Sequence, residues 1–313
     1  MRAIVTGARR TLGWLVPELP RARVAWVRAA LAVMTVLDVR FFLNATGDRG
    51  GTPELFQPVV LAQWLHLPPV TDSVAQVLFV GIHLGALALI LGGFARAPAV
   101  VQHAGGAVHA LSYVLWVLWA MSYGYVSHDH MAITIGVLVL TTAGTSRYGG
   151  GAAADAAAGW PLRMVQVFTV LTYFGSVLAK YVFSGGSLLR WVSSGTLAWA
   201  FIRRPNAVNA HFVTHAVLLR FLQWGAVLLE AASPLVFVLR GRWLALAIAS
   251  FLSFHLATFA LLGIHFLPTV VCWSAFVPWE RLPGWWQSRR QTARIRTRRV
   301  PAHRPQPLVH VDR

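Results

Sequence analysis

Long apolar runs, each close to 20 residues, recur along this chain and constrain its fold more than any other feature. A helix needs about 20 predominantly apolar residues to cross the hydrocarbon layer of a bilayer. Of the 313 residues, 57% are hydrophobic and only 12% are charged. This composition is far from that of a soluble globular domain. We therefore predict an all-α integral membrane protein.

Eight such runs follow one another, so we predict a polytopic bundle of about eight transmembrane helices. The first run is interrupted by Asp38 and Arg40, and the last is short and contains Pro268 and Pro278. The segment AGTSRYGGGAAADAAAGWP is rich in Gly and Ala and predicts a flexible loop. The predicted spans are residues 24–44, 74–95, 98–123, 129–146, 161–183, 213–239, 242–262 and 264–280.

The positive charge of the chain indicates how the bundle lies in its membrane. The net charge is +17, but the arginines precede the first span, occupy alternate connections or fill the C-terminal tail. By the positive-inside rule these segments are cytoplasmic, so we predict a multi-pass plasma-membrane protein with both termini inside. The bilayer, and not nucleic acid, is then the partner of the basic residues. The arginines of residues 184–211 are an exception, and that stretch is predicted to lie along the outer interface.

Three parts of the chain differ in composition. We predict a basic interfacial segment at residues 1–22, a transmembrane domain at 23–282 and an Arg-rich, disordered cytoplasmic tail at 283–313.

Lys180 is the only lysine in the chain, and the other 26 of its 27 Lys and Arg residues are arginines. It lies at the outer end of the fifth predicted span. A lysine at a helix end often extends its ammonium to the lipid headgroups. Arginine would do the same, however, and this chain uses arginine everywhere else. The chemical difference is that a desolvated lysine can lose its proton. Lys180 is therefore a candidate general base or nucleophile.

Other ionisable residues fall near the same predicted outer surface. His128, Asp129 and His130 open the fourth span, where Ser127 or Asp129 serving as a helix cap is the alternative to a functional role. Glu230 lies within the sixth span, so it must be neutral or paired.

For Glu230 we consider Arg163, Arg220 or a histidine as partners. His211 and His215 have the spacing of two ligands on one helix face, but no third ligand is evident and we predict no metal site. The single Cys272 excludes an internal disulfide.

The order of these features resembles a known family. The segments HDHMAI, RMVQVFTVLTYFGSVLAK, WGAVLLEAASPLVFVLRGR and FLSFHLATFALLGIHF resemble the horizontally transferred transmembrane domain, which is shared with vitamin K-dependent gamma-glutamyl carboxylase. The resemblance covers residues 20–282. It implies an enzyme of the lyase class, a quinol epoxidase and carboxylase.

The resemblance also implies roles for particular residues. Lys180 corresponds to the catalytic lysine and His130 to the active-site histidine, while His255, Tyr173 and Trp191 would bind the cofactor. That cofactor would be reduced menaquinone or another naphthoquinone, with O2 and CO2 as co-substrates. The active site would face the outside of the cell.

Two departures leave the substrate open. The gap between Lys180 and Trp191 is longer than in the carboxylase, and the Arg-rich tail is no counterpart of its large luminal domain. The alternative to an enzyme is a factor that matures or exports a secreted peptide. A transporter would favour paired broken helices in two symmetric halves, and no such symmetry is visible.

Overall fold

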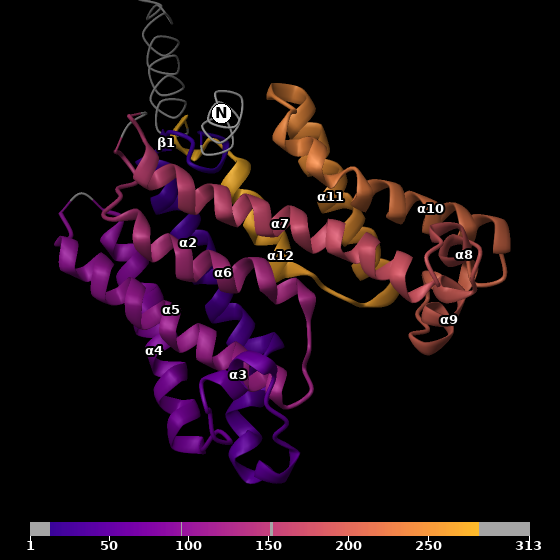
Figure 1. Cartoon of the computed structure of the whole chain (residues 1–313), viewed down its shortest axis with the longest axis horizontal. Helices are drawn as coiled ribbons and strands as arrows, with labels where there is room; N and C mark the ends of the chain where they lie inside the picture. Colours follow the sequence, from indigo (N-terminus) through magenta and orange to yellow (C-terminus); the bar gives the residue numbers. More distant parts are fainter. Residues whose placement is uncertain (1–12, 95, 151–152, 282–313) are drawn as a thin grey trace, which may run out of the picture.

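The computed structural model describes residues 13–94, 96–150 and 153–281. This part of the chain is mostly helical (Figure 1). Four of its helices are long and apolar enough to cross a membrane: α4 (Asp72–Gly92), α5 (Ala99–Ser122), α7 (Ala156–Phe183) and α11 (Gly241–Leu262). The predicted all-α membrane class is confirmed at this level.

Shorter helices occupy the other four predicted spans, and helical turns of a different pitch lengthen them. They are α2 (Arg21–Leu37) with a π-helical turn (Asp38–Phe42), α6 (Met131–Leu140) between 3-10 turns (His128–His130 and Thr141–Ala143), α10 (Ala216–Ala231) with a 3-10 turn (Ser233–Phe237), and α12 (Leu267–Cys272) with a 3-10 turn (Trp273–Phe276).

The connections contain small elements. β1 (Leu19–Pro20) pairs antiparallel with β2 (Ala154–Asp155). The others are α3 (Val60–Trp64), α8 (Leu188–Val192), α9 (Thr196–Arg203) and 3-10 turns at Asn44–Gly51, Pro53–Leu55, Asn209–His211 and Trp279–Arg281. His211 and His215 therefore do not share one helix, because the first lies in a 3-10 turn and the second precedes α10.

The arginine-rich connections meet at one end of the molecule, which we call the arginine-rich end. The β1 and β2 pairing brings the start of α2 beside the start of α7. Arg23 binds Glu280 at 2.6 Å, and Arg147 donates to the carbonyl groups of Gly92 and Ala97. Successive long segments therefore run alternately away from this end and back toward it (Figure 1).

Glycines allow α4 and α5 to pack closely along their length. A Cβ on Gly85 would lie 2.7 Å from the backbone nitrogen of His109 and 2.8 Å from the carbonyl oxygen of Gly105. Close backbone approach through small residues is typical of helix pairs in membranes. The main core lies beside this pair, where Leu31, Trp116 and Ile133 are buried.

The alanine-rich stretch before residue 161 is helical, so the loop prediction was wrong for residues 156–160. Asp155 caps α7 by accepting a hydrogen bond from the Ala157 N–H at 2.8 Å. Alanine has the highest helix propensity, and the cap supplies a start signal. The predicted segment 1–22 is described only from residue 13, and the tail 283–313 lies outside the described residues.

Candidate functional site

Lys180 lies one turn before the end of α7 and forms a nearly buried ion pair with Glu230 of α10. Its Nζ is 2.5 Å from Glu230 Oε2, and the side chains are 15% and 8% exposed. Glu230 is thus paired, as predicted, but not with Arg163, Arg220 or a histidine. The pairing is between two candidates that the sequence placed on separate helices.

Ser176 and Trp191 complete the surroundings of the Lys180 ammonium. Lys180 Nζ donates to Ser176 Oγ at 2.6 Å, and Ser176 in turn donates to Glu230 Oε1 at 3.3 Å. Ser176 precedes Lys180 by four residues, so both lie on one face of α7. Trp191 of α8 presents its ring to Nζ, with 5.1 Å between Nζ and the ring centroid. This cation–π contact brings together two of the predicted site residues.

Tyr173 continues the same face of α7 two turns earlier and joins a second predicted cofactor residue. The Tyr173 hydroxyl and His255 Nε2 are 2.6 Å apart, and Trp273 donates its indole N–H to the same hydroxyl at 2.9 Å. His255 Nδ1 is buried and has no hydrogen-bond partner among the described residues. One buried polar atom is therefore left available beside Tyr173.

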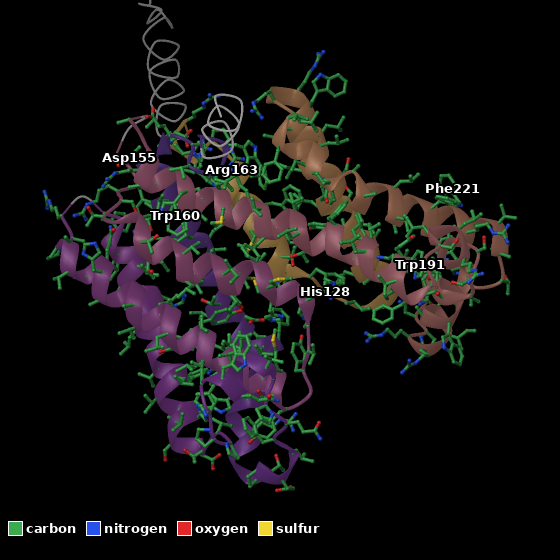
Figure 2. The ribbon with its side chains drawn as sticks, viewed as in Figure 1. His128, Asp155, Trp160, Arg163, Trp191 and Phe221 are labelled. Atoms are coloured by element: carbon green, nitrogen blue, oxygen red, sulfur yellow. The ribbon has the colours of Figure 1, made fainter. Side chains whose placement is uncertain are left out.

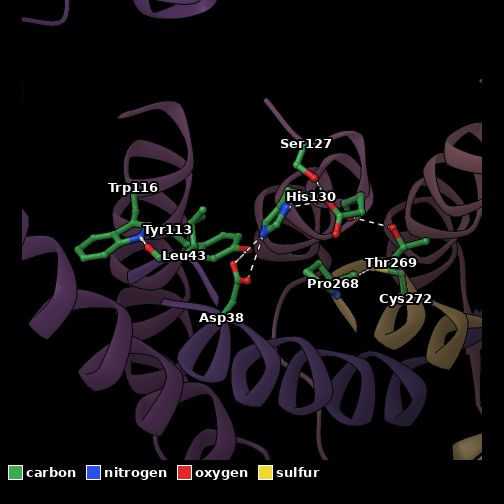
Figure 3. A network of polar contacts seen from close by, with 10 residues as sticks. Asp38, Leu43, Tyr113, Trp116, Ser127, His130, Pro268, Thr269 and Cys272 are labelled. Carbon is green, nitrogen blue, oxygen red and sulfur yellow. Dashed lines mark hydrogen bonds and ion pairs between the residues drawn. The ribbon is translucent and has the colours of Figure 1, made fainter. Parts of the chain in front are cut away.

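His130 belongs to a separate buried network near the end of α2 (Figure 3). Its Nδ1 is 2.9 Å from Asp129 Oδ1 and its Nε2 is 3.1 Å from Asp38 Oδ1. Tyr113 of α5 donates its hydroxyl to Asp38 Oδ2 at 2.8 Å. The imidazole is thus held between two carboxylates in the interior of the protein, with 1% of its side chain exposed.

Asp38 is the member of this network whose role the sequence did not reveal. Its charge looked like an interruption of the first span, whereas the structure buries it completely against His130 and Tyr113. Ser127 occupies the N-cap position of the 3-10 turn, but neither its side chain nor that of Asp129 bonds to a backbone N–H there. Asp129 instead accepts from the Ser127 hydroxyl and contacts His130.

The structure does not bring Lys180 and His130 into direct contact. Among the described residues, no hydrogen bond links the Lys180 group to the His130 group. α12 and the turn after it contact the His130 network and Tyr173. Thr269 donates to the Asp129 carbonyl group at 2.8 Å, and Trp273, in the turn that follows α12, donates to the Tyr173 hydroxyl. The ring of Phe266, which precedes α12, lies near His128 and His255, at centroid distances of 6.1 and 5.0 Å.

The chain was compared with models of protein families, with curated proteins and with solved structures, and none of these matches it. Its function must therefore be inferred from its own residues.

Proposed function

We propose that this protein is a multi-pass membrane enzyme that uses Lys180, coupled to Glu230, as a general base. The reaction would resemble that of vitamin K-dependent gamma-glutamyl carboxylase. The observation that supports this most is the nearly buried contact of the one lysine with Glu230, beneath Trp191. Ionisable side chains at membrane depth are costly and commonly functional.

The pair has a chemical property that an arginine would not give it. For Lys180 to act as a base, its proton must pass to another group, and Glu230 Oε2, 2.5 Å from Nζ, is placed to accept it. With the proton on Glu230, the Lys180 amine has a free lone pair and can accept a proton from a substrate hydroxyl. A guanidinium keeps its proton in proteins, so the same exchange is closed to arginine.

The nearby aromatic and polar groups fit a reduced naphthoquinone. The unpartnered, buried Nδ1 of His255 can form a hydrogen bond with a quinol oxygen, and the Trp191 ring offers a flat apolar surface beside Lys180. When bound, such a quinol would react with O2 to give an epoxide and water, while CO2 replaces the proton removed from a substrate carbon. Tyr173 would orient His255 through the hydrogen bond at Nε2.

Orientation in the membrane is part of the proposal. We infer eight crossings with the arginine-rich end and both termini in the cytoplasm. The eight segments alternate in direction (Figure 1), and most arginine-bearing connections lie at that end, with residues 184–211 as the exception. Lys180 is then near the outer surface of the plasma membrane. A secreted peptide or protein is the substrate class that such a position would serve.

The first prediction tests Lys180 as a base. The full chain in lipid discs is supplied with a chemically reduced naphthoquinone and O2, and epoxide is quantified by chromatography. We expect Lys180→Arg and Lys180→Ala to lower the rate at least about 100-fold, a typical contribution of general base catalysis. Incorporation of labelled CO2 into a glutamate-containing peptide tests the carboxylation step.

Lys180→Arg is the sharper of these variants because it keeps a cation next to Glu230. Unfolding temperatures of both variants show whether the fold persists. Full epoxide formation by Lys180→Arg would exclude the lysine as the base. If the parent protein forms no epoxide, the quinol-dependent reaction itself is excluded.

A non-enzymatic factor for maturation or export of a secreted peptide is the second candidate. The contacts of the Lys180 ammonium favour this candidate. Glu230, Ser176 and Trp191 all contact it, so it connects α7 with α8 and α10 and could have a purely structural role. In that case Lys180→Arg would retain full biological activity, because an arginine could form the same ion pair with Glu230. Loss of a secreted peptide's activity on deletion of the gene, without epoxide formation, would support it.

A further inference from the structure

A cavity of about 750 Å³ lies between α7 and α11 at the arginine-rich end, away from the Lys180 group. Figure 2 shows Arg163, which lines it, toward the opposite end of α7 from Trp191. One wall is apolar and includes Leu244, Ile248 and Leu252 of α11. These residues follow each other at intervals of four, so they form one stripe along the helix.

Arginines form part of the lining of this cavity. Arg163 of α7, Arg240 at the start of α11 and Arg281 all line it. Arg163 lies over the rings of Trp14 and Phe237, at 4.9 and 5.3 Å from their centroids, and donates to the Trp14 carbonyl group. Within the part of the chain that the structure describes, Arg240 donates to backbone carbonyl groups alone. The site thus combines an apolar wall with these three cations in its lining.

Two carboxylates of the described chain lie near the cavity, Glu280 and Glu18, the latter between the lining residues Pro17 and Leu19, and they are too few to neutralise the arginines that line it. Among the described residues, none of the three arginines forms an ion pair, and the neighbouring Glu280 is already bound to Arg23. The chain has ten acidic residues in all, and Asp312 is the one that lies outside the described residues. The cavity therefore has an excess of positive charge.

The surrounding helix surface is exposed toward the membrane. α11 is apolar, yet only 11% of its most hydrophobic window is buried within the protein. An apolar helix surface that the protein does not bury would contact acyl chains in a bilayer. Leu244, Ile248 and Leu252 of this helix also line the cavity, so the cavity wall is part of the same largely unburied helix.

We propose that the cavity binds one anionic phospholipid of the adjacent leaflet. Its phosphate would lie among Arg163, Arg240 and Arg281, and an acyl chain would lie along Leu244, Ile248 and Leu252. Basic pockets between transmembrane helices are suited to anionic headgroups by charge, and the apolar stripe fits a chain that a free phosphate lacks. This site is independent of the function proposed for Lys180.

The test counts lipids bound to the purified full chain. The protein in detergent is titrated with phosphatidylglycerol or with phosphatidylcholine of identical acyl chains, and native mass spectrometry records the bound molecules. We expect preference for phosphatidylglycerol and about fivefold weaker binding in Arg163→Gln or Arg240→Gln, the effect of about 1 kcal/mol per basic residue. An excess of inorganic phosphate should not displace the lipid.

Matched variants separate the cavity from general attraction to the basic surface. Arg242 lies two residues beyond Arg240 but does not line the cavity, so Arg242→Gln should bind like the parent. Ile248→Trp would fill the apolar slot and weaken binding, whereas Leu246→Trp, on an exposed part of α11, should not. Residues 282–313 are identical in all variants, so their contribution cancels.

Three outcomes would overturn the proposal. They are equal binding of the two lipids, equal losses in Arg242→Gln and Arg240→Gln, and displacement of the lipid by inorganic phosphate. Unfolding temperatures identify any variant that fails to fold, and Ile248→Trp then gives an independent result because it alters no charge. None of these measurements depends on epoxide formation.

Discussion

Glu230 and Lys180 are nearly buried, and each is the other's ion-pair partner. Removing one partner of a buried ion pair leaves an uncompensated charge and costs about 3–5 kcal/mol, whereas replacing both by apolar residues is often neutral. We therefore expect Glu230→Ala alone to lower the free energy of unfolding strongly. The double variant Lys180→Met with Glu230→Leu should recover most of this loss.

Reversible unfolding in mixed micelles, followed by circular dichroism, measures both effects. Ser250→Ala serves as a control because Ser250 is half-buried on α11, away from the ion pair, and its hydroxyl donates to the Leu246 carbonyl group of its own helix. Equal stabilities of Glu230→Ala and the double variant would contradict the coupling. The outcome separates the structural part of the pair from its effect on catalysis, which Lys180→Arg measures.

At the level of single residues, the sequence was a better guide to which side chains are candidates for function than to which side chains contact each other. Lys180 was identified because it differs from every other cation in the chain, and that observation does not require the fold. The partner of Glu230 depends on how α7 and α10 cross, and no local pattern encodes that crossing. Asp38 was missed for the same reason, since His130 and Tyr113 come from distant elements.

The start of α7 offers a test at the level of one element. The Ala157 backbone N–H, and next to it the Arg21 guanidinium, lower the pKa of Asp155 below its usual value of 3.8. A carboxyl whose pKa is lower in the folded state stabilises the fold above its unfolded pKa and loses this effect as pH falls through the folded pKa. Asp155→Asn keeps an oxygen that can cap the helix but has no charge to titrate.

We therefore expect the parent protein to unfold at a higher temperature than Asp155→Asn at neutral pH. The difference should shrink below about pH 4 and disappear at more acidic pH, where Asp155 is protonated in both states. Thermal unfolding scans across this pH range measure it. A difference that is constant with pH would show that the charge of Asp155 has no role.

Hydropathy located the eight apolar helical segments because the requirement for apolar length is local, whereas the short helices α3, α8 and α9 lie outside the predicted spans. The predicted starts and ends differ from the structure by a few residues, and the largest difference is at the start of α7, where caps and alanine propensity extend the helix into the expected loop. The π-helical turn after α2 could not be predicted, since it depends on tertiary contacts of Asp38.

For the whole molecule, the proposed orientation can be tested with two matched glycines. Gly149 lies between α6 and α7, and Gly195 lies between α8 and α9; both are exposed, and an added Cβ would meet no atom within 4 Å. In a Cys272→Ser background, Gly195→Cys should react with a membrane-impermeant maleimide in intact cells. Gly149→Cys should react only after the cells are permeabilised.

Mass shifts of the purified protein report the labelling, and permeabilised cells show that both positions are reactive. Labelling of Gly149→Cys in intact cells, with protection of Gly195→Cys, would reverse the orientation and place Lys180 at the cytoplasmic surface. The positive-inside rule supports the proposed direction because most arginine-bearing connections lie at the arginine-rich end. The connection of residues 184–211, which carries Arg190, Arg203 and Arg204, is the exception.

The length of α7 has a consequence for where the protein is stable. Arg163 and Lys180 lie on this one helix, 17 residues apart. At 1.5 Å per residue their Cα atoms are separated by about 26 Å along the axis, close to the thickness of a bilayer's hydrocarbon layer. In a membrane whose hydrocarbon layer is much thicker than this separation, Arg163 and Lys180 could not both reach a polar surface. Such a membrane would have to thin locally around the protein, or one of the two side chains would lie in the hydrocarbon layer.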